Sequence, residues 1–133
     1  MKATKKAAIL ATLLSGLATA GTASAVEYRF RVNVDVKDLM PGVIPKVQCD
    51  VFGRASGTRP LAIGSERARA VNGNFRGVVT VRVNVLSGEP TWYRCRLYMM
   101  KGKGGYLANM SGAPSWARAR PGTRVVNQLH GRL

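Results

Sequence analysis

One stretch of the chain, TWYRCRLYMM at residues 91–100, alternates between two kinds of side chain. As a β-strand, it would project Trp92, Arg94, Arg96 and Tyr98 to the same side. Guanidinium groups bind carboxylate or phosphate groups through paired hydrogen bonds, and aromatic rings offer stacking surfaces for bases or sugars. The pattern therefore predicts a binding site for an anionic glycan, a lipid headgroup or a nucleic acid on this strand.

Further cations lie near this stretch in the sequence. Lys101 and Lys103 follow it and extend its charge. Arg29, Arg31 and Arg82 would join it in a continuous basic face if their strands were its neighbours in a sheet. The alternative is an ordinary solvated surface, on which aromatic and long side chains stabilise adjacent strands and arginine stacks on the protein's own rings.

A catalytic centre is not expected in this chain. His130 is the only histidine, and it stands near the C-terminus, where we expect a frayed, exposed tail. A Ser-His or Cys-His arrangement has no other candidate for its base. The acidic residues fall at outward or turn positions or near the start of the domain, and nothing marks two of them as partners for acid–base chemistry. They are Glu27, Asp35, Asp38, Asp50, Glu66 and Glu89.

Metal and phosphate sites have no better support. No group of histidine, cysteine and acidic residues has the spacing of metal ligands. The glycine-rich run KGKGG at residues 101–105 lacks the strand–loop–helix context of a phosphate-binding loop, so we expect a hairpin tip. The sequence therefore predicts a non-catalytic protein without a cofactor or a metal.

Cys49 and Cys95 are the only cysteines. In an exported chain, an even number of cysteines indicates a disulfide. A two-cysteine metal site is the weaker alternative, because a single histidine is available to complete it. In the chain-entropy model, a disulfide that closes a loop of this length stabilises the folded state by about 4 kcal/mol.

Several segments alternate between apolar and polar residues, which is typical of strands with one buried face. The clearest are residues 26–37, 43–52, 75–86 and 91–100. Residues 61–71 also suit a short helix, although we favour one or two short strands there. Asn72-Gly73 is a strong signal for a tight turn. Short alternating strands over about 100 residues favour an antiparallel β-sandwich, with a small closed barrel as the alternative.

The positions of the two cysteines resemble the immunoglobulin-like pattern. Cys49 lies within an early strand and Cys95 within a late one, and Tyr93 stands two residues before the second cysteine. The resemblance implies a sandwich of about seven strands, a disulfide between its sheets, and Tyr93 in the tyrosine-corner position. The buried tryptophan expected after the first cysteine is missing, so the resemblance extends to architecture only.

Residues 1–25 have the features of a cleavable signal peptide. Lysines at the start are followed by a short apolar run, and the segment ends in Ala23-Ser24-Ala25. A membrane anchor is the alternative, but polar residues and glycine interrupt a run shorter than the 20 or so residues a span needs. We therefore expect one secreted or periplasmic domain at residues 26–133.

The domain is strongly basic. The whole chain has a net charge of +15, and without the three lysines of residues 1–25 it retains 18 Lys and Arg against 6 Asp and Glu, a net charge of +12. Such a surplus attracts polyanions, although solubility alone could account for it. We predict a binding domain for an anionic polymer or surface. One alternative is a structural or assembly subunit of a cell-envelope complex, which could pair by strand addition. The other is a small secreted inhibitor or a small enzyme.

Overall fold

The computed structural model describes residues 25–54, 59–108, 110–118, 123–126 and 130–133. The predicted signal peptide therefore lies outside the described residues, apart from its last one. The described residues form strands and a single 3-10 turn, η1 (Ser115–Ala117). The strands are β1 (Val26–Val36), β2 (Ile44–Phe52), β3 (Ala62–Arg67), β4 (Phe75–Val85), β5 (Trp92–Lys101), β6 (Gly104–Leu107), β7 (Arg124–Val126) and β8 (His130–Arg132).

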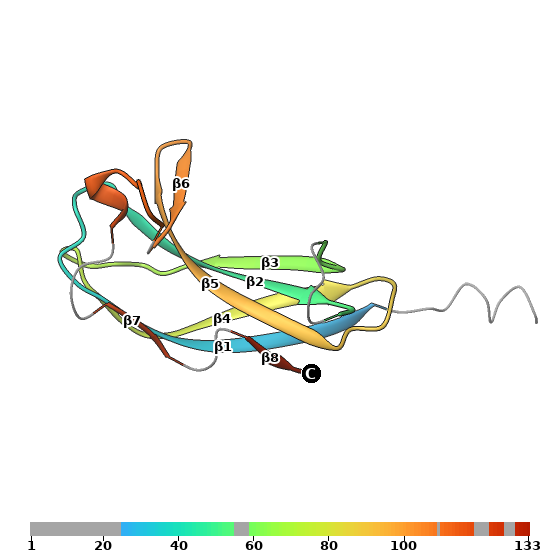
Figure 1. Ribbon diagram of the computed structural model, residues 1–133. Helices are drawn as coiled ribbons and strands as arrows, with labels where there is room; N and C mark the ends of the chain where they lie inside the picture. Colours follow the sequence, from blue (N-terminus) through green and yellow to red (C-terminus); the bar gives the residue numbers. More distant parts are fainter. Residues whose placement is uncertain (1–24, 55–58, 109, 119–122, 127–129) are drawn as a thin grey trace, which may run out of the picture.

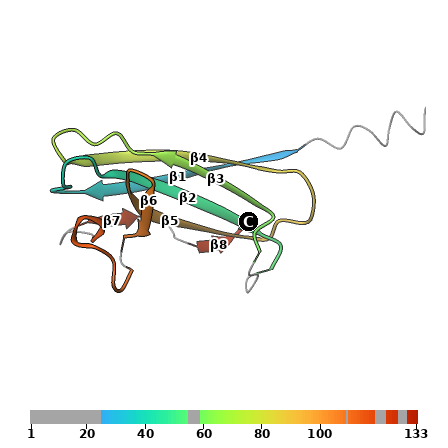
Figure 2. The same ribbon diagram turned by 90° about the horizontal axis from the view of Figure 1, so that it is seen from above.

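These strands form two antiparallel sheets that lie against each other (Figures 1 and 2). The first sheet has the order β4-β1-β7, and the second has the order β3-β2-β5-β6, with β8 also paired to β5. The predicted all-β antiparallel sandwich with one disulfide is confirmed. The described part of the chain contains no helix long and apolar enough to span a membrane.

The core consists mainly of valine side chains from the inner faces of the two sheets. β1 and β4 pair along their whole lengths, from Val26 opposite Val85 to Val36 opposite Phe75. Their alternate residues are buried as the sequence pattern predicts, because successive side chains of a strand point to opposite faces. The buried residues of these two strands are Val32, Val34, Val36, Val79, Val81, Val83 and Val85.

The two sheets approach closely along the edge where β3 faces β4. Gly64 of β3 lies so near the backbone of β4 that an added Cβ would overlap the carbonyl oxygen of Arg82. The same Cβ would come within 2.9 Å of a methyl group of Val83. Glycine is therefore required at this point by the close contact of two backbones.

The turn between β3 and β4 has the predicted conformation. Asn72 and Gly73 both have positive φ angles, 52° and 78°, as the central residues of a type I′ turn require. The backbone nitrogen of Leu39, between β1 and β2, donates a hydrogen bond to the carbonyl of Gly73 at 2.9 Å. The two connections at this end of the sandwich are thereby joined.

The disulfide is present, but it does not bridge the two sheets as the immunoglobulin-like pattern implied. Cys49 of β2 and Cys95 of β5 are directly opposite each other on neighbouring strands of the same sheet, with their Cα atoms 4.0 Å apart. Both are fully buried. Tyr93 reaches across the sandwich instead, where its ring stacks on that of Phe30 with centroids 4.8 Å apart.

The C-terminal segment differs from the expected frayed tail. His130, Gly131 and Arg132 form β8 and pair with residues 92–94 of β5. The nitrogen of Leu133 then donates a hydrogen bond to the carbonyl of Thr91 at 2.9 Å. Because β7 pairs with β1 in the first sheet, the end of the chain passes from one sheet to the other. Residues 61–71 contain β3, so the preferred interpretation as a strand was correct.

Candidate anion-binding face

The predicted site residues share one surface, the outer face of the second sheet. Trp92, Arg94, Arg96 and Tyr98 occupy alternate positions of β5 and are each half-buried, whereas the residues between them belong to the inner face. β5 lies between β2 on one side and β6 and β8 on the other. Neighbouring strands therefore set what these four side chains contact.

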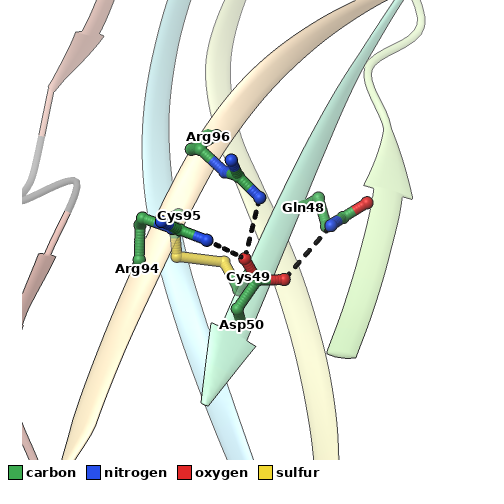
Figure 3. Close-up of a disulfide and its surroundings, with 6 residues drawn as sticks. All are labelled: Gln48, Cys49, Asp50, Arg94, Cys95 and Arg96. Atoms are coloured by element: carbon green, nitrogen blue, oxygen red, sulfur yellow. Dashed lines mark hydrogen bonds and ion pairs between the residues drawn. A yellow bond between two sulfur atoms is a disulfide. The ribbon is translucent and has the colours of Figure 1, made fainter. Parts of the chain in front are cut away.

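A buried carboxylate holds the two arginines in place (Figure 3). The Nη2 atoms of Arg94 and Arg96 lie 3.1 and 3.0 Å from Oδ2 of Asp50, which is opposite Arg94 on β2. The amide of Gln48 donates a hydrogen bond to the other oxygen, Oδ1, at 3.1 Å. The side chain of Asp50 is only 2% exposed, although its position is on the outer face. Two guanidinium groups and one amide cover it.

The charge of this cluster is not balanced. One carboxylate faces two guanidinium groups, so one positive charge is left over. The side chains of Arg94 and Arg96 remain 43% and 30% exposed, so parts of both groups stay accessible to a ligand. Their Nε atoms are buried without a hydrogen-bond partner. Asp50 was expected to be an ordinary outward residue, and its burial corrects that expectation.

Two aromatic rings of the same face already make cation–π contacts with cations of the protein itself. Arg94 lies 5.1 Å from the ring centroid of Phe52, and Arg96 lies 5.5 Å from that of Tyr98. The ammonium group of Lys46 is 5.6 Å from the same Tyr98 ring. The self-stacking weighed as the alternative thus occurs at two rings. Trp92 has no stacking or cation–π partner among the described residues.

The neighbouring strands add cations that the sequence pattern did not identify. Lys46 of β2 lies opposite Tyr98 and, on its other side, opposite Arg67 of β3, while Arg132 of β8 lies opposite Trp92. With the two arginines of β5, these residues form a diagonal line across the sheet. We call this line the cationic track: Arg67, Lys46, Arg96, Arg94 and Arg132.

The cationic track is long, and a single acidic residue lies beside it at an outward strand position. From the level of Tyr98 to that of Trp92, it follows β5 for about 20 Å at the usual rise per residue. Asp50 is the one acid at the outward strand positions that the structure describes on this face. Sequence alternation could place Lys46, Arg94 and Arg96 on outer faces, but it could not place them side by side, and it assigned neither Arg67 nor Arg132 to this surface.

The other predicted extensions of the site lie elsewhere. Arg29, Arg31 and Arg82 belong to β1 and β4 of the first sheet, so they face away from β5 and do not continue its surface. Lys101 ends β5, and its ammonium group lies 5.9 Å from the ring centroid of Trp116. Lys103 is in the turn of the β5–β6 hairpin, so the expected hairpin tip is confirmed.

No protein-family model, no curated protein and no solved structure matches this chain. Within the described ranges, no three His, Cys, Asp or Glu side chains come together in a group that could hold a metal ion. His130 lies opposite Arg94 in the β5–β8 pairing. The disulfide indicates an oxidising, extracellular-type environment.

Proposed function

We propose that this chain is an exported, non-catalytic domain that binds an acidic polysaccharide along the cationic track. The observation that carries the proposal is the cluster at Asp50, where a buried carboxylate fixes two partly exposed guanidinium groups and leaves one positive charge unpaired. Fixed groups lose little conformational freedom when a ligand binds, which favours affinity. Guanidinium groups also suit the carboxylate, sulfate or phosphate groups of such a polymer.

A polymer fits the track better than a small anion does. The cations follow one another diagonally over four strands, and the surface that carries them is a sheet face. A ligand with regularly repeated charges contacts all five at once, whereas a small anion reaches one or two. Release of counterions from the polymer then contributes to binding and makes it sensitive to salt.

The occupied rings favour an acidic polysaccharide over single-stranded nucleic acid. Binding of single strands relies on free aromatic rings for base stacking. Here Phe52 is buried, and the rings of Phe52 and Tyr98 already contact the protein's own cations. Trp92 is the one ring at the outward positions of β5 without such a partner among the described residues, and a single ring does not support a run of stacked bases. Charge recognition remains available in this arrangement. The proposed secreted or periplasmic location agrees with this choice, because acidic glycans are common polyanions outside the cytoplasm.

The test compares two variants with the same loss of charge. Lys46→Gln/Arg67→Gln removes two track cations and leaves the pairs at Asp50 intact. Arg54→Gln/Lys103→Gln removes two exposed cations from loops outside the track. Binding of the mature chain to alginate, a polyuronate, is measured over a salt series, with heparin and single-stranded DNA as further probes.

We expect the track variant to bind alginate about tenfold more weakly, with a salt slope lower by about 1 for each cation removed. The loop variant should stay within about twofold of the wild type. Equal losses in both variants would show that net charge alone attracts the polymer. Stronger binding to single-stranded DNA than to alginate would contradict the choice of ligand class.

The alternative of an assembly subunit has a distinct signature. An assembly subunit that pairs by strand addition would form concentration-dependent oligomers that persist at high salt. An immunoglobulin-like relationship is supported by the two antiparallel sheets, whereas the disulfide within one sheet departs from that pattern.

A further inference from the structure

A second arginine pair lies on the opposite side of the sandwich. Arg29 of β1 and Arg82 of β4 are directly opposite each other on the outer face of the first sheet. Both contact Glu27: Nη2 of Arg29 lies 3.2 Å from its Oε2, and Nε of Arg82 lies 3.9 Å from its Oε1. The ratio of two guanidinium groups to one carboxylate found at Asp50 is therefore repeated on the other face.

The surroundings of this second pair are also basic. Arg31 and Arg76 occupy outward positions of β1 and β4, and both are exposed. We call the surface that carries the four arginines the opposite face; these are Arg29, Arg31, Arg76 and Arg82. The acids at outward positions of these two strands are Glu27 and Asp35. The opposite face thus carries a surplus of positive charge, although a smaller one than the cationic track.

The two basic surfaces cannot be reached by one short ligand. They belong to different sheets, and packed sheets lie about 10 Å apart with a dry core between them. Valines of β1 and β4 and the cysteines of β2 and β5 fill that core. At one edge, β3 and β4 are in close contact at Gly64, so no passage between the faces exists there.

From these observations we propose that the domain is bivalent and bridges two segments of acidic polysaccharide, one on the cationic track and one on the opposite face. This inference rests on the proposed function and adds to it that one copy of the chain links polymer strands. The opposite face binds more weakly, because Glu27 is 37% exposed and its arginines are 60% and 64% exposed. Arginines exposed to this extent are less fixed than those at Asp50 and are screened by salt.

The experiment measures stoichiometry with a polyuronate oligomer just long enough to span the track. Isothermal titration calorimetry at low salt should show two oligomers bound per wild-type chain. One binding event should have a lower Kd than the other. The variant Arg31→Gln/Arg76→Gln leaves both ion pairs at Glu27 intact. It should lose the weaker binding event, and the Kd of the tighter binding event should stay within about twofold of the wild-type value. The loop variant Arg54→Gln/Lys103→Gln should keep both events.

Light scattering with long alginate gives a second readout. Wild type and the loop variant should form large complexes near equal charge, and these should dissolve in excess protein. The opposite-face variant should bind the polymer with far less scattering. One oligomer per wild-type chain, or unchanged stoichiometry and scattering in the opposite-face variant, would overturn bivalency while leaving the proposed function in place. No binding of the oligomer at all would overturn both.

Discussion

At the scale of single residues, Asp50 determines how the candidate site is held. Its carboxylate accepts from Arg94, Arg96 and Gln48, so its negative charge is compensated despite its burial. An isolated buried carboxylate would be costly, whereas a paired and hydrogen-bonded one is tolerated. The same residue thus makes the arginines part of the fold and fixes their positions for a ligand.

Replacement of Asp50 by asparagine should destabilise the domain by about 1 to 3 kcal/mol. Hydrogen bonds to a charged group contribute about 1.5 to 3 kcal/mol, and the amide oxygen of an asparagine can still accept a hydrogen bond, which lowers the expected loss. A fully buried pair would cost more when broken, but Arg94 and Arg96 are partly exposed and can be rehydrated. The free energy of unfolding from urea titration, followed by tryptophan fluorescence, measures the effect.

Glu27→Gln is the matched control, since it also removes one carboxylate from between two arginines. Glu27 and its partners are much more exposed than the Asp50 cluster, so we expect a loss below about 1 kcal/mol. Equal losses for the two variants would contradict the structural role assigned to Asp50.

At the scale of strands, alternation predicts which residues face the core but not which strand is the neighbour. The pattern in residues 26–37 and 75–86 is realised in β1 and β4, where buried valines alternate with polar residues. Cys49 and Cys95 were expected in different sheets, yet β2 and β5 pair directly. Strand partners depend on contacts between distant segments, and a period of two contains no information about them.

The candidate site shows the same limit. Trp92, Arg94, Arg96 and Tyr98 were predicted from one strand and do share one face. Asp50, Lys46 and Arg132 come from β2 and β8, and only the pairing places them beside that strand. Alternation along β2 predicted Asp50 at an outward position. It could not show that Arg94 and Arg96 of β5 bury this carboxylate.

Contact between the strand edges leads to a second prediction. Gly64→Ala should destabilise the domain by about 1 to 3 kcal/mol or prevent folding, because the new methyl group overlaps the backbone of Arg82 and one of the two strands must shift. Gly104→Ala is the control in another strand, where the nearest atom to an added Cβ is 3.6 Å away. Thermal unfolding of both variants compares them. A Gly64→Ala protein as stable as the control would show that β3 and β4 do not touch.

At the scale of the whole molecule, the stabilisation expected from the disulfide is a large fraction of the free energy of unfolding of a domain of this size. Cys49 and Cys95 are 46 positions apart in the sequence, and the loop they close is worth about 4 kcal/mol in the chain-entropy model. Domains of about 100 residues have a net stability of about 5 to 15 kcal/mol. Urea titration with and without reductant should therefore show a markedly lower midpoint for the reduced chain. An unchanged midpoint, with both thiols shown to be free by alkylation, would contradict this role.

The last prediction concerns the expected export of the chain, which would place Cys49 and Cys95 in an oxidising compartment. Val26, the first residue after the expected cleavage site, is also the first residue of β1 and is 52% exposed, so the expected cleavage site adjoins the domain at a surface position. Expression of the full chain in a secreting bacterial host should yield a product that begins at Val26 and lacks free thiols. Ala25→Leu places a larger residue at the cleavage site and should accumulate the precursor. Intact mass and N-terminal sequencing measure both results. A wild-type product that keeps residues 1–25 and stays in the membrane fraction would show that this segment is an anchor.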